Sequence, residues 1–336
     1  MNRYKFSTKN LNIKTDLLSK LIDSCLGCRE MTRSEVSQLS CVSETTAGKL
    51  LSALDECRFT SLTYKRNPDG GSPQKLHSLS DNLSSLVIDL SKKTFSYSLI
   101  VGSGECKLYE SRPFDPTVNG KENLTAFLSR VGAAVAEKKV AVSTVSVIVA
   151  DESSSLPTLF KVREEICNFI AAFFGISPTL CIDRKESLAF AIKYNRINQN
   201  IESTRIAYIL ISDTPTAIFF PKSGDPITCS LESLMLTDRI TAAEMLESAT
   251  DENDVSHVLA RISNLMNCAY SPDSIIIEYE GIRIGAKTLS QIKNIFALTN
   301  SPLPELSISK CAPGLAHYGA AAASNAILIK KHIKGL

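Results

Sequence analysis

Cysteines are the residues of this sequence whose type and spacing most directly raise the question of metal chemistry. Ten cysteines are scattered along the 336 residues, and only Cys25 and Cys28 have a C-x-x-C spacing. A structural zinc site needs a second pair of ligands, which the other cysteines are not spaced to supply. We therefore expect buried free thiols in a reducing cytoplasm, and no metal or other cofactor.

Basic side chains suggest a different chemistry, the binding of an anion. Residues 1–80 carry a net charge of +4, whereas the remaining 256 residues carry −2. An excess of positive charge on a short segment favours an anionic partner, and we expect this partner to be double-stranded DNA. The residues that we expect to contact DNA are Arg33, Ser43, Glu44, Thr45, Thr46, Lys49, Lys65, Arg66 and Lys75.

Three predicted helices would position these side chains. The first is predicted over "TDLLSKLIDSCLG", where apolar residues recur at helical spacing and a glycine follows. The second begins at Thr32, which has capping-box spacing to Glu35, and it buries Val36 and Leu39. The third begins at Ser43, a good N-cap, and its predicted buried residues are Ala47, Leu50, Leu51 and Leu54.

The joint between the second and third helices is short, because only Cys41 and Val42 separate them. Such a joint is typical of a helix-turn-helix, whose last helix enters the major groove of DNA. In this arrangement Thr45, Lys49 and Ser52 point outward. The alternative interpretation is a small three-helix bundle that contacts another protein.

A β-hairpin is predicted after the third helix. "FTSLTYKRNPDGGSPQKLHSLS" contains two alternating segments around the turn signal "NPDGG". A hairpin in this place is the wing of a winged helix-turn-helix, from which Lys65, Arg66 and Lys75 could contact phosphates.

The rest of the chain alternates between predicted strands and helices. From residue 86 the sequence predicts three strands followed by helix–strand units, and from residue 205 it predicts a second such series. This pattern indicates a duplicated α/β fold. Hydrophobic residues make up 44% of the chain, which is typical of a globular protein, and no apolar run approaches the ~20 residues that span a bilayer. The N-terminus also lacks the apolar stretch of a secretory signal.

The order of these segments resembles the ROK family (repressors, open reading frames and sugar kinases), whose body has the duplicated actin/hexokinase-like, ribonuclease H-like ATPase fold. The matching segments are "GGSPQKLHSL", "LMNCAYSPDSIIIEYEG" and "YGAAAASNA". The resemblance implies a winged helix-turn-helix over residues 1–80, a first α/β lobe over 81–200 and a second over 201–336. It also implies a homodimer and a sugar-like effector.

The glycine-rich turns that hold ATP in the kinases of this family are altered here. The resemblance places an Asp-x-Gly-Gly-Thr turn at "DLSKKT", where Asp89 is kept but Ser91, Lys92 and Lys93 replace the small residues. A second glycine turn is replaced by "ISDTPTAIF", in which Pro215 lacks an N–H group. The late Gly-Gly is replaced by "IEYEG". Because backbone N–H groups must approach the phosphates closely, we expect no ATP site of the family type.

The sugar and zinc sites that the resemblance implies are also incomplete. Asp183 aligns with the catalytic base of the family, but Ile182 stands where its partner Asn belongs. A lone carboxylate before a helix is more often an N-cap. The expected His-and-three-Cys zinc motif is represented by Cys229 and His257 alone. Asp89 and Asp183 are therefore a vestigial ligand site at most.

Taken with the resemblance, the residues predict a DNA-binding transcriptional regulator whose kinase-like body is a pseudokinase that serves dimerisation and ligand sensing, and not an enzyme. One alternative is an active sugar kinase with a vestigial N-terminal region. The other is a protein that uses both regions for interactions with partners other than DNA. In family repressors an Arg of the wing reaches the minor groove, whereas this sequence has Ser72.

Overall fold

The computed structural model describes most of the chain. The described residues are 21–23, 30–66, 70, 72–91, 94–113, 120–149, 163–198, 205–212, 215–221, 226–231, 234, 236, 240–249, 251–280, 284, 286–299, 302–312 and 314–334. They form two compact units, one of residues 1–199 with 314–336 and the other of residues 200–313. Among the described residues, no helix is long and apolar enough to cross a membrane.

The N-terminal region contains two capped helices. Helix α2 spans Arg33–Leu39 and begins with the predicted capping box, in which Thr32 and Glu35 each satisfy a backbone N–H of the other. Helix α3 spans Glu44–Glu56 and has Ser43 as its N-cap. Most of the first predicted helix lies outside the described residues, although residues 21–23 are helical. Between α2 and α3, Cys41 has a φ of 54°, the left-handed conformation that lets the chain turn sharply.

A hairpin follows α3, as the sequence predicts. Strands β1 (Thr60–Lys65) and β2 (Gln74–Leu79) pair antiparallel. Met31 extends this pairing on the other side of β2, because its N–H and C=O groups both bond to the backbone of His77 at 2.8 Å. The hairpin is thus anchored to the chain immediately before α2.

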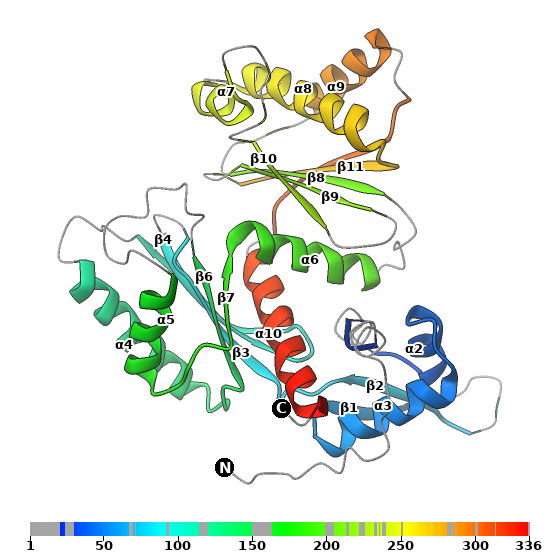
Figure 1. The fold of residues 1–336 in the computed structure, drawn as a ribbon, viewed down its shortest axis with the longest axis vertical. Coiled ribbons are helices and arrows are strands. Elements are labelled where there is room, and N and C mark those ends of the chain that lie inside the picture. Colours follow the sequence, from blue (N-terminus) through cyan, green and yellow to red (C-terminus); the bar gives the residue numbers. More distant parts are fainter. Residues whose placement is uncertain are drawn as a thin grey trace. The chain divides into compact units, whose positions relative to one another are not determined.

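The first unit also contains a mixed five-stranded sheet with the order β5-β4-β3-β6-β7. Its strands are β3 (Ser84–Asp89), β4 (Thr94–Val101), β5 (Cys106–Pro113), β6 (Thr144–Val149) and β7 (Leu180–Asp183). Its helices are α4 (Gly120–Glu137), α5 (Arg163–Phe174), α6 (Arg184–Asn198) and α10 (Leu315–Lys334). Figure 1 shows α4 and α5 on one face of the sheet and α10 on the other. Every residue of β3 and β6 is buried, as expected for parallel strands covered on both faces.

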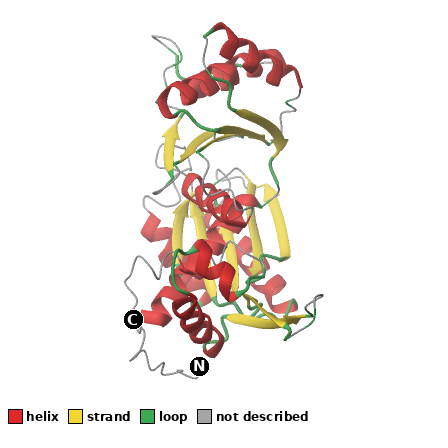
Figure 2. Ribbon diagram, turned by 90° about the vertical axis from the view of Figure 1, so that its right-hand side faces the viewer, coloured by secondary structure: helices red, strands yellow, loops and turns green. Residues whose placement is uncertain are grey.

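The second unit repeats this topology with the order β10-β9-β8-β11-β12. Its strands are β8 (Ile206–Ile211), β9 (Thr216–Phe220), β10 (Ile227–Ser230), β11 (Ser274–Tyr279) and β12 (Glu305–Lys310). Its helices are α7 (Ala242–Ser248), α8 (Glu252–Tyr270) and α9 (Ala286–Leu298). Figures 1 and 2 show these helices on one face of the sheet. Strands β10 and β12 and helices α7 and α9 are not among the elements predicted from the sequence, but the predicted duplication is confirmed.

The closing helix α10 belongs to the first unit by its contacts. The lobe boundaries expected from the sequence group α10 with residues 201–313, because it follows them along the chain. In the structure it packs on α6, β3 and β6 of the first unit. The crossing with α6 is close at Gly319, where an added Cβ would lie 1.8 Å from the carbonyl oxygen of Ser187. Only glycine allows the two helix backbones to approach in this way.

Helices α6 and α10 also complete the core of the N-terminal region. One hydrophobic cluster contains Leu50, Leu54 and Phe59 of that region together with Tyr194 of α6 and Ile329 of α10. An ion pair adds to this contact, since Lys193 Nζ lies 2.8 Å from Asp23 Oδ2. The helices of the N-terminal region are therefore packed against the sheet-bearing part of their own unit.

Candidate functional site

The exposed face of α3 is the first candidate site. Thr45, Lys49 and Ser52 are exposed, as predicted. The predicted inward residues Ala47, Leu50, Leu51 and Leu54 are buried, together with Ala53. The exposed face of the helix therefore carries Thr45, Lys49 and Ser52, with Glu44 and Glu56 exposed at its two ends, while its apolar stripe faces the core.

The first turn of α3 is occupied by its own capping contacts. Ser43 Oγ accepts a hydrogen bond of 3.2 Å from the backbone N–H of Thr46. The hydroxyl groups of Ser43 and Thr46 also lie 2.9 Å apart. These two residues support the helix N-terminus, whereas the side chain of Thr45 is exposed beside them.

An ion pair links α2 to α3. Arg33 Nη2 lies 3.1 Å from Glu44 Oε2, and both side chains are about half exposed. The aliphatic part of Arg33 covers Gly48, because a Cβ at that position would be 3.0 Å from Arg33 Cδ. Two of the predicted DNA-contacting residues are thus paired with each other across the joint between the helices.

The hairpin carries the remaining basic residues. Lys65, Arg66 and Lys75 are all exposed. In the observed register Lys65 is opposite Gln74, and Lys75 is opposite Tyr64. Because side chains alternate along a strand, Lys65 and Lys75 lie on opposite faces of the hairpin.

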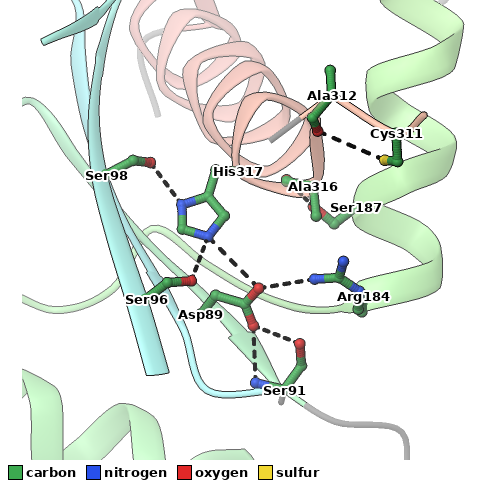
Figure 3. Close-up of polar contacts among 10 residues, drawn as sticks. All are labelled: Asp89, Ser91, Ser96, Ser98, Arg184, Ser187, Cys311, Ala312, Ala316 and His317. Atoms are coloured by element: carbon green, nitrogen blue, oxygen red, sulfur yellow. Dashed lines mark hydrogen bonds and ion pairs between the residues drawn. The ribbon is translucent and has the colours of Figure 1, made fainter. Parts of the chain in front are cut away.

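The second candidate site surrounds Asp89 at the end of β3 (Figure 3). The carboxylate is 2% exposed. Its Oδ2 lies 3.0 Å from Arg184 Nη1 and 3.6 Å from His317 Nε2. Its Oδ1 accepts hydrogen bonds from the backbone N–H of Ser91 at 2.9 Å and from the hydroxyl of Ser91 at 2.5 Å. Both oxygens are therefore engaged by groups of the same chain.

The imidazole of His317 completes this cluster. It is 3% exposed and lies between two serine hydroxyls of β4, with Nδ1 2.8 Å from Ser98 Oγ and Nε2 3.0 Å from Ser96 Oγ. Burial alone would raise the pKa of Asp89. The hydrogen bond with His317 and the positive charge of Arg184 outweigh it, so that the pKa of this carboxyl lies well below its usual range.

Arg184 and His317 are the functional-site residues that sequence reasoning missed. Arg184 directly follows Asp183, and His317 is near the start of a helix made largely of small apolar residues. A buried arginine and a buried histidine both need a partner, but only the fold shows that Asp89 is the partner of both.

Asp183 has a different environment. Its Oδ1 accepts a hydrogen bond of 2.7 Å from the backbone N–H of Glu186, which makes it an N-cap of α6. Strands β3 and β7, which end at Asp89 and Asp183, are separated in the sheet by β6.

In the second unit, β11 carries a carboxylate close to its end. Glu278 Oε2 accepts a hydrogen bond of 2.8 Å from Tyr208, whose pKa is raised by burial and by the charge of Glu278. Pro215 is half-buried immediately before β9. Lys92 and Lys93, which we expect to obstruct the first phosphate turn, lie outside the described residues.

The two residues of the expected zinc motif, Cys229 and His257, do not belong to a group of potential metal ligands among the described residues. His257 is exposed on α8, as predicted for a surface residue. Cys229 Sγ lies 3.5 Å from the hydroxyl of Tyr270. In the part of the chain that the structure describes, no three His, Cys, Asp or Glu residues are grouped so that they could hold a metal ion.

Comparison with known proteins identifies the fold. No protein-family model matches the chain, and no curated protein matches it by sequence. Among solved structures, a ROK family transcriptional regulator that is a homolog of the E. coli MLC protein matches with 14% identity and a TM-score of 0.56. That alignment covers 95% of this chain and 97% of the other.

Two kinases match over a shorter part of the chain. The ROK hexokinase from Thermus thermophilus has 11% identity and a TM-score of 0.52, over 71% of this chain and 97% of its own. An inorganic polyphosphate/ATP-glucomannokinase from Arthrobacter sp. strain KM has 13% identity and a TM-score of 0.50, over 73% and 98%. The chain therefore has the actin/hexokinase-like fold of ROK proteins, as the sequence predicts.

Proposed function

We propose that this protein is a DNA-binding transcriptional regulator with a ROK-like body that does not phosphorylate sugars. The observation that carries the proposal is the geometry of residues 30–79. Two capped helices meet at a two-residue joint with a left-handed Cys41, and a hairpin follows that is paired to Met31. These features support a winged helix-turn-helix, in which α3 would be the helix that enters the major groove.

The exposed residues of this region suit DNA. The side chain of Lys49 is exposed on α3, and those of Lys65, Arg66 and Lys75 are exposed on or beside the hairpin strands. Lys49 is one turn into the helix, where a cation can reach a guanine edge or a phosphate. The hairpin residues are placed to contact the sugar–phosphate backbone, which positions the protein without reading bases.

The coverage of the structural matches supports a regulator. The regulator aligns over 95% of the chain, whereas the two kinases align over 71% and 73%. Because the two kinases are covered over 97% and 98% of their own lengths, more than a quarter of this chain has no counterpart in them. We also infer that the protein forms a homodimer, because two winged regions could then contact half-sites about 34 Å apart.

The environment of Asp89 supports an inactive body. In a kinase of this fold the residue would face the phosphates and their metal ion, which requires a carboxylate that is free to bind them. Here Asp89 is 2% exposed and already paired with Arg184 and His317. A nucleotide would have to break this buried ion pair, which costs several kcal/mol. The body would then serve to dimerise and to sense a small, sugar-like effector.

Selection of an operator from random DNA duplexes tests the proposal. We expect the purified protein to enrich one sequence, and the double variant Lys49→Ala, Arg66→Ala to lose that enrichment. The matched control is Lys310→Ala, which removes an exposed strand lysine from the second unit. If no sequence is enriched and the double variant binds duplex DNA like the parent, the N-terminal region is not a DNA reader and an interaction with another protein takes its place.

The sugar kinase is the second candidate, because the Thermus thermophilus hexokinase shares the fold. It predicts sugar-dependent release of ADP from ATP, whereas the regulator predicts none. A coupled assay with a panel of hexoses distinguishes the two functions, and turnover in that assay would refute the inactive body.

A further inference from the structure

A cavity of about 350 Å³ lies where α4 covers β4 and β5 of the first unit. Its lining includes Phe95, Arg112, Pro113, Ala126, Phe127 and Arg130. Nothing in the proposed function uses this cavity. Its volume is at the lower end of the range for sites that bind small molecules.

The floor of the cavity is aromatic and rigid. Phe95 is 3% exposed and Phe127 is 9% exposed. Their rings meet edge to face with centroids 5.7 Å apart, and the ring of Tyr97 lies at the same centroid distance from Phe127. A packed group of three rings keeps its shape without a ligand, so that an apolar molecule would meet a preformed surface.

Two arginines stand at the edge of this floor and share one carboxylate. Arg112 Nε lies 2.5 Å and Arg130 Nε 3.4 Å from the same oxygen, Oε1 of Glu110. The other oxygen of Glu110 accepts a hydrogen bond of 2.6 Å from the hydroxyl of Tyr97. Both contacts of the arginines use Nε, and among the described residues no other group forms an ion pair or hydrogen bond with their terminal nitrogens.

The charges of this group do not cancel. The hydrogen bond from Tyr97 and then that from Arg112 lower the pKa of Glu110, which is therefore ionised at neutral pH. Two guanidinium groups and one carboxylate leave one positive charge beside an apolar floor. Arginine retains its charge at every physiological pH and binds carboxylates through paired N–H groups.

We propose that this cavity binds a small organic monoanion, a carboxylate attached to a compact apolar body. The carboxylate would contact the terminal nitrogens of Arg112 and Arg130, and the apolar body would lie on Phe95 and Phe127. The single excess charge matches one negative charge, and Glu110 would repel a polyanion such as a nucleotide. This ligand differs in class from the sugar-like effector of the proposed function, and its binding does not depend on DNA binding.

Binding of 2-naphthoate to the full-length protein tests the proposal, with the neutral 2-naphthamide as the matched probe. We expect calorimetry to show saturable binding of 2-naphthoate at one site per chain, and binding of the amide at least tenfold weaker. Equal binding of the two probes would show that the arginines do not recognise charge and would overturn the proposal. Absence of saturable naphthoate binding would overturn it as well.

Three variants locate the bound probe. Arg112→Gln with Arg130→Gln should weaken 2-naphthoate binding at least tenfold. Ala126→Trp should block it by filling the cavity while both arginines remain. The control Arg205→Gln should bind like the parent, because Arg205 is a partly exposed arginine of the second unit that is paired with Asp273 at 2.9 Å. Unchanged binding in the first two variants would place the probe elsewhere, and Ala126→Trp decides the matter if the double variant does not fold.

Discussion

At the scale of single residues, Asp89 is held by partners from three segments of the chain. Ser91 follows it directly, Arg184 is the first residue of α6, and His317 is near the start of α10. A buried ion pair of this kind adds little net stability when it forms, but the loss of one member leaves the other charge buried. Asp89 is therefore a residue on which the fold depends.

Replacing Asp89 with Asn should lower the free energy of unfolding at pH 7 by about 3–5 kcal/mol, because Arg184 would stay buried without its ionised partner. Urea unfolding followed by circular dichroism measures this change. The control is Asp183→Asn, where Asn caps a helix about as well as Asp, so that the change should be less than about 1 kcal/mol. Equal effects of the two substitutions would show that the Asp89 ion pair does not matter for stability.

The same pair predicts a pH dependence. The pKa of Asp89 is lowered in the folded protein, so its contribution is present above the unfolded pKa of about 3.9 and is lost as the pH falls further toward the folded value. The stability difference between the parent and Asp89→Asn should therefore shrink by about 1 kcal/mol between pH 7 and pH 3. A difference that stays constant over this range would contradict an ionised, paired Asp89.

Lys49 and Arg66 should contribute to DNA binding in different ways. Lys49→Ala should cost about 1–3 kcal/mol on the selected operator and relax base preference at one position. Arg66→Ala should weaken binding to all sequences similarly and reduce the salt dependence by roughly one phosphate contact. Titrations of operator and unrelated DNA at several salt concentrations measure both effects. Identical behaviour of the two variants would contradict the assignment of α3 to the major groove.

At the scale of elements, α6 and α10 connect the two candidate sites of the first unit, the surroundings of Asp89 and the region that contains α3. Their N-terminal residues Arg184 and His317 contact Asp89, while Tyr194 and Ile329 farther along belong to the core shared with α3. The close crossing at Gly319 holds these two helices together.

Substitution of Gly319 with Ala should lower the free energy of unfolding by about 1–3 kcal/mol or more. The new Cβ would lie 1.8 Å from the carbonyl oxygen of Ser187 and 2.8 Å from the amide nitrogen of Ala191, which is too close for either contact. Gly132→Ala in α4 is the matched control, since its Cβ would meet only a ring atom of Phe174 at 3.6 Å. In this control the free energy of unfolding should stay unchanged or rise by up to about 1 kcal/mol, because Ala has a higher helix propensity than Gly. Thermal and urea unfolding of both variants give the comparison, and a neutral Gly319→Ala would refute the close crossing.

At the scale of the whole molecule, both sheets have three antiparallel strands followed by two parallel ones. This repeated topology belongs to a fold that supports many functions, so that the function depends on the residues placed at its strand ends. Here the charge of Asp89 is balanced by an ion pair with Arg184, and Glu278 accepts a hydrogen bond from Tyr208.

ATP with magnesium should therefore show no binding in calorimetry at millimolar concentrations. The carboxylate that would hold the metal-bound phosphates is buried and paired, and the half-buried Pro215 has no N–H group to offer. The Thermus thermophilus hexokinase, which shares the fold, provides the positive control. Saturable ATP binding to this protein would refute the inactive body and favour the kinase.

The sequence by itself determined the local elements of this protein. The capping box at Thr32, the N-cap at Ser43 and the buried face of α3 depend on neighbouring residues, and all three are found as predicted. Strands β3, β4 and β6 of the first sheet were predictable because each contains a largely apolar run. Strands β10 and β12 were missed because they are short or largely exposed and lack such a run.

Only the tertiary structure decided which distant residues meet. The partners of Asp89 are 95 and 228 positions away along the chain, at Arg184 and His317, and no local pattern links them. The register of the hairpin, which places Lys65 and Lys75 on opposite faces, likewise depends on pairing across the turn. The packing of α10 in the first unit follows from the close contact at Gly319, because only a backbone without a side chain can approach Ser187 so closely.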